Sequence, residues 1–223
     1  MRKAFIVFLL TIFSSNLLFA YDIQGQVKLK SPYPQAEMLK VPEKHCNDCG
    51  KEKLSPKLKI SKDGSVANAV IRLEGSFPAS LNAETQKTYV LDQINCEFAP
   101  HVMLVPVDST VTVLNSEAFI HDVRAYDERA KLFFYGTMPT KGQKLSRKFN
   151  QAGRFVMRCG FHKWMYAFVV VQDHPYYALT DENGNFKISG VPDGNYTLSV
   201  WHETLGEVKT EVGIKNKIVN VVY

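Results

Sequence analysis

A short segment in the second half of the chain carries three side chains that can bind a metal ion. Cys159, His162 and Met165 stand at every third position, so a thiolate, an imidazole and a thioether can reach one ion from a single loop. His121 lies upstream and could supply a fourth ligand. Two His, one Cys and a weakly bound Met are the ligand set of a blue-copper site. The sequence therefore predicts one type 1 copper ion at these four residues.

The same donor set predicts what the ion would do. Thiolate and thioether sulfur suit copper(I), imidazole suits both oxidation states, and a His-His-Cys plane with a distant Met changes little between them. A site of this kind is suited to the transfer of single electrons. Phe161 and Trp164 stand within the same segment, and we expect their rings to shield the ion from water and to favour its reduced form.

Strands must position these ligands, because strand signals dominate the sequence and helical periodicity is nearly absent. Residues 153–158 lead into Cys159, and residues 166–172 leave the segment as an almost continuous apolar run. A run that apolar must be covered on both faces of its sheet. His121 closes a strand-like run, and we expect it to arrive from a neighbouring strand. The ligand segment is thus predicted to be a loop held between two core strands.

The N-terminal part predicts two strands separated by a long loop. Residues 21–29 alternate apolar and polar side chains, and residues 66–73 have the pattern of a second strand. Three prolines interrupt any regular element between them. Residues 30–53 are therefore expected to form a long loop that carries Cys46 and Cys49.

The C-terminal part, residues 174–223, predicts turns and short strands. Asn183-Gly184 between two short strand-like runs is a strong hairpin signal, and Asp193-Gly194 marks a second turn. About fifty residues are few for an independent core. We therefore expect this tail to pack against strands from elsewhere in the chain.

The central part of the chain, residues 88–173, resembles the cupredoxins. The motifs that carry the resemblance follow the family's order: Phe98-x-Pro100, then Asn115-x-Glu117 with His121, then Cys159, His162 and Met165. The resemblance implies a Greek-key β-sandwich, a mononuclear type 1 copper and electron transfer.

Two features depart from the family pattern. Asp122 stands where the family usually has an Asn that hydrogen-bonds to the ligand loop, and an ionised carboxylate can accept but not donate such a bond. The segment from Cys159 to Met165 is also short.

The flanking parts resemble carboxypeptidase regulatory-like domains, which are transthyretin-type β-sandwiches. The motifs are, in order, Gly25-x-Val27, Ala69-x-Ile71-x-Leu73, Thr180-Asp181 with Gly184-x-Phe186, and Pro192-x-Gly194-x-Tyr196. These pieces lie on both sides of the cupredoxin-like block. The resemblance therefore implies an all-β chain in which the cupredoxin-like sandwich is inserted in, or adjacent to, a small regulatory-like sandwich, with parts at residues 21–87, 88–173 and 174–223.

The four cysteines compete for different roles. A ligand Cys must remain a free thiolate, whereas a disulfide from Cys159 to Cys46 or Cys49 would remove it from a metal site. With Cys159 as a ligand, we favour a disulfide between Cys49 and Cys96, since both stand at domain-joining positions. A disulfide between Cys46 and Cys49 would close a tight loop of little stabilising value.

A second metal site is a further alternative for the remaining cysteines. His101 or His45 could join them, since thiolate and imidazole are ligands of zinc and of copper(I). We nevertheless expect His101 to be a hydrogen-bonded core histidine, the commoner role of a buried His.

The N-terminus predicts export. Arg2 and Lys3 precede an apolar run at residues 4–13, and Ala20 offers a small residue for cleavage, as in a secretory signal peptide over residues 1–20. The alternative is an uncleaved anchor. Later apolar runs are too short to span a bilayer. We therefore expect no stable membrane insertion after cleavage, and a periplasmic or secreted location.

Charge argues against a nucleic-acid partner. Removal of residues 1–20 lowers Lys+Arg from 27 to 25 against 22 acidic residues, a net charge of +3, and the basic residues are spread along the chain. A redox protein is the expected partner, and the sequence specifies neither its identity nor the oligomeric state of the chain.

Taken together, these patterns predict an exported mononuclear copper protein that carries single electrons. No nucleophile with a base and no paired carboxylates can be assigned to one site, so we do not expect an enzyme. Copper storage or delivery is one alternative. A non-redox module that binds a cell-surface or carbohydrate ligand is another, and a structural module whose cysteines all pair is a third.

Overall fold

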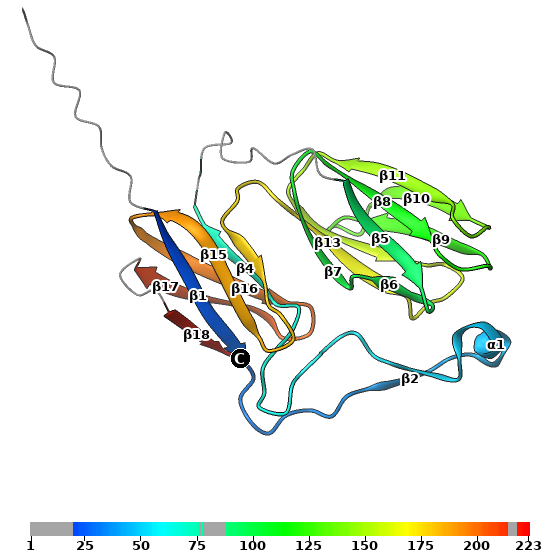
Figure 1. Ribbon diagram of the computed structural model, residues 1–223, viewed down its shortest axis with the longest axis horizontal. Helices are drawn as coiled ribbons and strands as arrows, with labels where there is room; N and C mark the ends of the chain where they lie inside the picture. Colours follow the sequence, from blue (N-terminus) through cyan, green and yellow to red (C-terminus); the bar gives the residue numbers. More distant parts are fainter. Residues whose placement is uncertain (1–19, 76, 78–87, 214–217) are drawn as a thin grey trace, which may run out of the picture.

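A computed structural model of the chain describes residues 20–75, 77, 88–213 and 218–223 (Figure 1). These residues lie mostly in strands, and the all-β fold class is confirmed. The predicted signal peptide lies outside the described residues apart from Ala20, where the first strand begins. Within the described part, no helix is long and apolar enough to cross a membrane.

The strands between Thr88 and Gln172 form one β-sandwich, called here the nine-stranded sandwich. Its sheets have the strand orders β10-β9-β12-β13-β7 and β11-β8-β5-β6. The pairs β13–β7 and β5–β8 are parallel, and the other pairs are antiparallel. The strands are β5 Thr88–Ile94, β6 Glu97–Ala99, β7 Val102–Pro106, β8 Ser109–Asn115, β9 His121–Tyr126, β10 Leu132–Met138, β11 Lys144–Phe149, β12 Gly153–Arg158 and β13 Tyr166–Gln172.

Alternation along these strands builds a core between the two sheets. Val111 and Val113 on β8 point into the same buried cluster as Val169 and Val171 on β13, because alternate residues of a strand share one face. Aromatic rings add buried area to this core, with Phe149 and Phe155 in edge-to-face contact. This core supports the strands that carry the predicted ligands.

Strands from both ends of the described chain form a second sandwich, the seven-stranded sandwich. Its sheets have the orders β15-β1-β18 and β14-β4-β16-β17, and β1 pairs with β18 in parallel. The expectation that the C-terminal tail packs against strands from elsewhere is therefore met. The strands are β1 Ala20–Lys28, β4 Val70–Glu74, β14 Tyr177–Leu179, β15 Asn185–Pro192, β16 Asn195–His202, β17 Gly206–Gly213 and β18 Ile218–Val222.

The two sandwiches lie side by side, and β13 belongs to the layer where they meet (Figure 1). Val170 of β13 and Val102 of β7 pack against Val70 of β4 in a small cluster of their own. The opposite face of β13 lies in the core of the nine-stranded sandwich. The apolar run at residues 166–172 is thus covered on both faces, as the sequence predicts.

The N-terminal segment between the first two long strands is not a plain loop, and that prediction is wrong. β2 Met38–Lys40 and β3 Glu52–Leu54 pair antiparallel, with η1 Glu43–His45 and α1 Cys46–Cys49 at the tip. We call this hairpin, residues 38–54, the arm. It extends from the base of the seven-stranded sandwich along the nine-stranded one (Figure 1). The prolines lie outside its two strands, so they permit the pairing.

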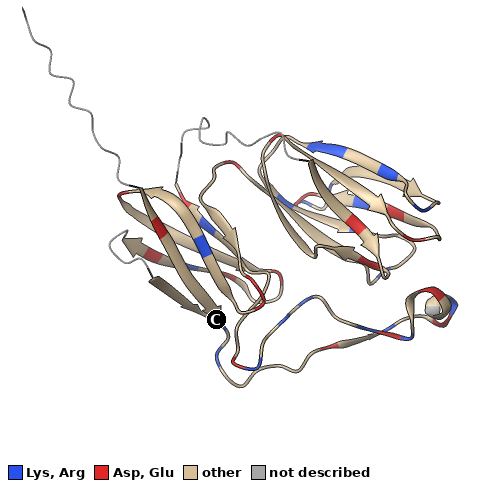
Figure 2. Ribbon diagram, in the orientation of Figure 1, with Lys and Arg blue, Asp and Glu red and all other residues tan. Residues whose placement is uncertain are grey.

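Two smaller predictions also need correction. His121 begins β9 rather than closing a strand. Asn183-Gly184 does form a turn, closed by hydrogen bonds between Asp181 and Asn185, but the strands on either side join different sheets. The turn therefore connects the two layers of the seven-stranded sandwich instead of making a hairpin. Basic and acidic residues are interspersed along both sandwiches (Figure 2).

Candidate metal centre

Three of the four predicted ligands converge in a buried site. The Sγ of Cys159 lies 3.7 Å from Nδ1 of His121 and 3.6 Å from Nδ1 of His162. The two Nδ1 atoms are 3.1 Å apart. His121, Cys159 and His162 are all buried. We call them the triad.

These distances fit a metal bound to all three donor atoms. A metal at about 2.0–2.1 Å from each nitrogen and about 2.3 Å from sulfur would hold nitrogen and sulfur about 3.6–3.8 Å apart, and the nitrogens about 3.1–3.5 Å apart. All three measured separations fall within or near these ranges. Two imidazoles and one thiolate are the plane of a blue-copper site.

The ligand loop gets its shape from its own backbone. It joins β12 to β13, whose register pairs Arg158 with Tyr166. The Cys159 N–H donates to Met165 C=O at 3.1 Å, and the Met165 N–H donates to His162 C=O at 2.8 Å. Met165 is buried at the end of the loop, just before β13 begins and paired through its C=O with Cys159. Its role as axial ligand stays a prediction.

His121 comes from the adjacent strand, and the turn before it is held by Asn115. The Asn115 side chain donates to Phe119 C=O at 3.0 Å and to Met138 C=O at 2.9 Å, and it accepts from the Glu117 N–H at 2.9 Å. β9 pairs with β12. The Asn-x-Glu motif therefore fixes His121 beside the start of the ligand loop.

Glu117 sets the orientation of the His121 ring. Nε2 of His121 donates to the Glu117 carboxylate at 2.7 Å, so Nδ1 is left to face Cys159. Burial lowers the pKa of His121, but the neighbouring Cys159 and Glu117 outweigh burial and raise that pKa to about 9. Burial, followed by the nearby His121 and His45, lowers the pKa of His162 to about 4. At neutral pH one imidazole of the metal-free triad is therefore protonated, and a metal must displace that proton.

Asp122 links the His121 strand to the ligand loop in the way that its acceptor-only carboxylate allows. Its Oδ1 accepts a short hydrogen bond from the Gly160 N–H, and its Oδ2 accepts from Arg124 Nε at 2.9 Å. A Cβ on Gly160 would lie 2.4 Å from the Arg124 guanidinium, so the absence of a side chain there leaves room for this pairing. Asp122, in place of the expected Asn, thus still connects β9 to the ligand loop through Gly160, and it also binds the Arg124 guanidinium.

Several rings cover His162, which is only 3% exposed. The rings of His45, Trp164 and Phe119 have centroids 4.7, 5.3 and 5.8 Å from that of His162. Of the two rings that we expect to shield the ion, Trp164 contacts the His162 ring, whereas Phe161 is 41% exposed and its shielding role stays a prediction. Sequence reasoning missed His45 and Phe119 as covering residues, although Phe119 lies two residues before a predicted ligand.

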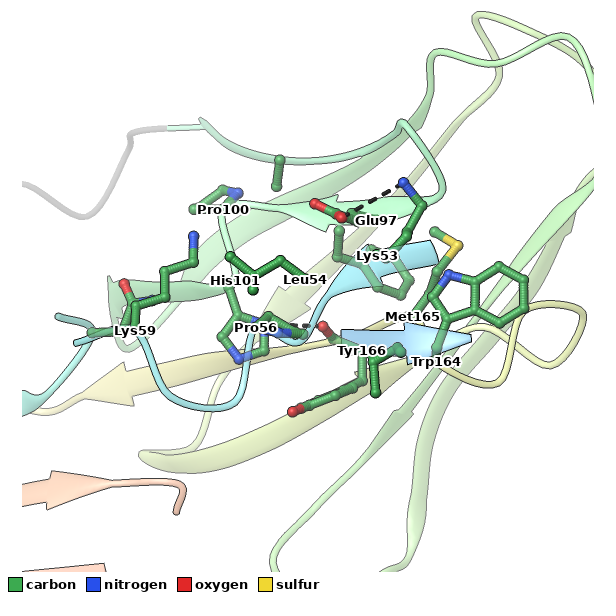
Figure 3. Close-up of a pocket in the computed structure, with 14 residues that line it drawn as sticks. Lys53, Leu54, Pro56, Lys59, Glu97, Pro100, His101, Trp164, Met165 and Tyr166 are labelled. Atoms are coloured by element: carbon green, nitrogen blue, oxygen red, sulfur yellow. Dashed lines mark hydrogen bonds and ion pairs between the residues drawn. The ribbon is translucent and has the colours of Figure 1, made fainter. Parts of the chain in front are cut away.

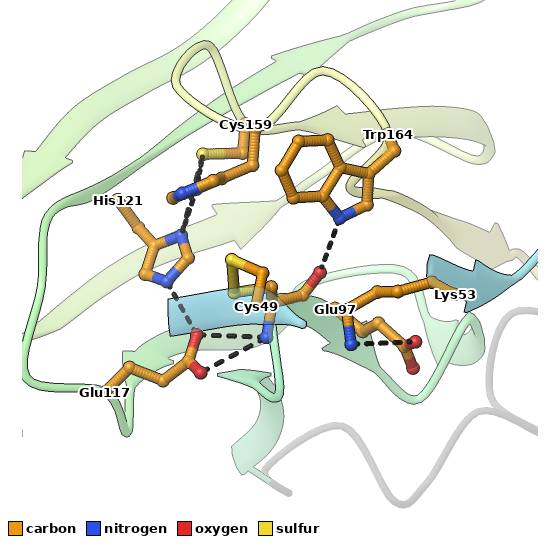
Figure 4. The surroundings of a disulfide bond; sticks show 9 residues. Cys49, Lys53, Glu97, Glu117, His121, Cys159 and Trp164 are labelled. Carbon is orange, nitrogen blue, oxygen red and sulfur yellow. Dashed lines mark hydrogen bonds and ion pairs between the residues drawn. A yellow bond between two sulfur atoms is a disulfide. The ribbon is translucent and has the colours of Figure 1, made fainter. Parts of the chain in front are cut away.

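The disulfide between Cys49 and Cys96 is confirmed and lies beside the triad (Figure 4). Cys159 is a free thiol, so the alternative in which it pairs with Cys46 or Cys49 is wrong. Glu117 contacts both features, since its carboxylate also accepts from the Cys96 N–H at 3.1 and 3.2 Å. The disulfide therefore attaches the tip of the arm next to the candidate metal site.

His101 is buried and hydrogen-bonded, as the sequence predicts. Its Nε2 makes a short contact with the Glu203 carboxylate, and its Nδ1 lies 3.2 Å from the Tyr166 C=O. It lines a cavity of about 340 Å³ between the arm and the nine-stranded sandwich (Figure 3). Trp164 and Met165 form part of the wall of this cavity, together with Lys53 of the arm.

No family model matches the sequence, and no curated protein matches it. Solved structures do match. A copper-containing nitrite reductase from Thermus scotoductus SA-01 is 22% identical over 39% of this chain, with a TM-score of 0.34, and this chain spans only 22% of the reductase chain. A purple cupredoxin from Nitrosopumilus maritimus is 22% identical over 38% of this chain and 98% of its own, with a TM-score of 0.33. A reduced amicyanin variant is 30% identical over 47% of this chain and 99% of its own, with a TM-score of 0.36. These similar structures are cupredoxins.

Proposed function

We propose that the chain binds one type 1 copper ion at His121, Cys159 and His162, with Met165 as the axial ligand, and carries single electrons. The observation that carries this proposal is the geometry of the triad. Its nitrogen–sulfur separations of 3.6 and 3.7 Å are those of donors around one ion. A copper ion held there would exchange one electron between its two oxidation states with little change in geometry.

The surrounding residues suit this role. Glu117 fixes the ring of His121 through its hydrogen bond at 2.7 Å, and Asp122 fixes the ligand loop through Gly160. Trp164 and Phe119 exclude water from His162. Since both imidazoles and the thiol are held before any ion arrives, the donors need little rearrangement during electron transfer.

Further parts of the proposal follow from the sequence. We propose that the chain is exported to the periplasm or secreted, that residues 88–173 are a cupredoxin-like domain inserted in a regulatory-like sandwich made from residues 21–87 and 174–223, and that the chain is no enzyme. The partner would be a redox protein and not a nucleic acid, in keeping with the interspersed charges of both sandwiches (Figure 2).

Absorption after addition of copper(II) tests the proposal. A copper–thiolate bond should give an intense band near ~600 nm, and Cys159→Ser should abolish it. Cys46→Ser is the matched control, because it removes a thiol outside the triad and should leave the band intact. A colourless wild-type protein that binds copper would refute a type 1 site.

Copper storage or delivery is the second candidate function, and the burial of His162 favours it. A ligand that is 3% exposed under a disulfide-linked arm should release its metal slowly. Cyclic voltammetry separates the two functions. A reversible one-electron wave supports electron transfer, whereas tight copper(I) retention without such a wave supports storage.

A further inference from the structure

A second group of soft donors lies next to the triad. The ligand atoms of Cys49, Cys96 and His162 lie within 4.8 Å of one another, and all three residues are buried. This group and the triad share His162. We propose that Cys49 and Cys96, once their disulfide is reduced to two thiols, form a second metal site with His162, and that this site takes copper(I).

Three separate segments bring these donors together. Cys49 lies on α1 at the tip of the arm, Cys96 lies in the turn between β5 and β6, and His162 lies in the ligand loop. The Cα atoms of the two cysteines are 5.5 Å apart. That separation allows both sulfurs to reach one ion, because each side chain can rotate about its own Cα–Cβ bond.

The backbone of Cys96 is fixed independently of the disulfide. Its N–H donates to Glu117 at 3.1 and 3.2 Å, and its C=O accepts from Trp164 Nε1 at 3.1 Å (Figure 4). Trp164 also contacts the His162 ring. Reduction of the disulfide therefore leaves Cys96 and His162 in place beside each other, and only Cys49 gains freedom.

Movement of the arm would let a reductant reach the disulfide. β2 and β3 pair only with each other among the described strands, so no sheet hydrogen bond has to break when the arm moves. Cys49 is 6% exposed and Cys96 is fully buried. A dithiol reductant would therefore attack the sulfur of Cys49, and the resulting mixed disulfide would be resolved by the second thiol of the reductant.

The step balances without a further reactant. The dithiol reductant loses two electrons and two protons and becomes a disulfide, while Cys49 and Cys96 gain them and become thiols. Copper(I) then replaces the two thiol protons, which leave to water. Two thiolates and one imidazole are soft donors that select copper(I) over harder ions.

The two sites compete for His162. A neutral imidazole has one nitrogen lone pair, so His162 serves the second site when that site is filled. The first site then keeps His121 and Cys159, which still suit copper(I). The reduced chain should thus hold one copper(I) more than the disulfide form, so its copper capacity would follow the thiol redox state of its surroundings.

Copper(I) counting under anaerobic conditions tests the proposal. The full chain is prepared with its disulfide intact or reduced by a dithiol, which is then removed, and copper(I) is titrated against a chromophoric copper(I) chelator. We expect the bound copper to rise by one ion per chain on reduction. The test is the increase in bound copper(I) on reduction, not the total bound. If the first site binds no copper, the count should still rise from zero to one, so failure of the first site is distinguishable from failure of the second.

Variants and a second measurement complete the test. Cys49→Ser with Cys96→Ser should show no rise, whereas the control Cys46→Ser should rise by one as the wild type does. If the double variant does not fold, alkylation of the reduced wild type gives the answer. The additional copper(I) should slow alkylation of Cys49 and Cys96 at least tenfold. No rise, unprotected thiols, or loss of the folded circular-dichroism spectrum on reduction would each overturn the proposal.

Discussion

Replacement of Glu117 by Gln should change the protonation of the candidate ligand His121 in the metal-free protein. The Glu117 carboxylate accepts from Nε2 of His121 at 2.7 Å, and both side chains are largely buried. The pKa of His121 is raised from 6.5 to about 9 by Cys159 and Glu117 together, against the effect of burial. That increase corresponds to about 3 kcal/mol of stability, to which Cys159 and Glu117 both contribute. The amide keeps an acceptor oxygen but loses the charge, so the pKa of His121 should fall by about one.

The sign of the stability effect follows from linkage. A raised pKa in the folded state stabilises the protein fully below pH 6.5, and this stabilisation is lost as the pH rises through about 9. Glu117→Gln should therefore cost about 1–2 kcal/mol at pH 6 and little at pH 10. NMR titration of the imidazoles and urea unfolding at both pH values measure the two effects. Glu97→Gln is the matched control, since Glu97 is half exposed and pairs with Lys53 at 3.7 Å. A pKa of His121 that stays at its wild-type value, or an equal loss of stability at both pH values, would refute this reasoning.

Three other perturbations have defined outcomes. The pKa of the buried His174 is lowered to about 4 by burial, followed by the charge of Arg72. The unfolded chain therefore binds a proton that the folded chain does not between pH 6.5 and about 4. The wild type should therefore lose up to about 3 kcal/mol of unfolding free energy as the pH falls from 6.5 to about 4. His174→Gln should abolish this loss, and urea unfolding at both pH values measures it. Gly160→Ala brings a Cβ to 2.8 Å from the Asp122 carboxylate. It should lower the unfolding free energy by about 1–3 kcal/mol, and an unchanged urea midpoint would contradict the crowding. Phe149→Ala empties a fully buried site and should cost about 3–5 kcal/mol in the same assay, whereas Phe161→Ala at an exposed position should cost less than about 0.5 kcal/mol.

The parts of the site that depend on local sequence could be predicted. β12 and β13 occupy the predicted residues 153–158 and 166–172, because alternation and apolar runs are local signals. The spacing of Cys159 and His162 likewise predicts that one loop can offer both donors. His121 joins them from the adjacent strand, which the Asn-x-Glu motif indicated. The disulfide from Cys49 to Cys96 was also correctly preferred.

The covering of the site could not be predicted, because it depends on contacts between distant parts of the chain. His45 contacts His162 through the arm, and the sequence around His45 carries no periodic pattern that would reveal a hairpin. Phe161 and Trp164 are both aromatic neighbours of the ligand, yet only Trp164 packs against it. Trp164 is held in place by a hydrogen bond from its Nε1 to the Cys96 C=O at 3.1 Å, and Cys96 lies 68 residues away in the sequence, so the local sequence does not reveal this contact.

The pairing of β1 with strands near the other end of the chain determines the order in which the two sandwiches can fold. β1 lies between β15 and β18, so it has no sheet partner until those strands have been synthesised. The strands of the nine-stranded sandwich are contiguous from Thr88 to Gln172, and contiguous units close their loops at lower entropic cost and fold earlier. We expect the sheets that carry the triad to form first and to bring β4 and β14, which flank them in the chain, within reach of each other. The strands that carry the candidate metal centre would then be folded before β1 pairs with β15 and β18.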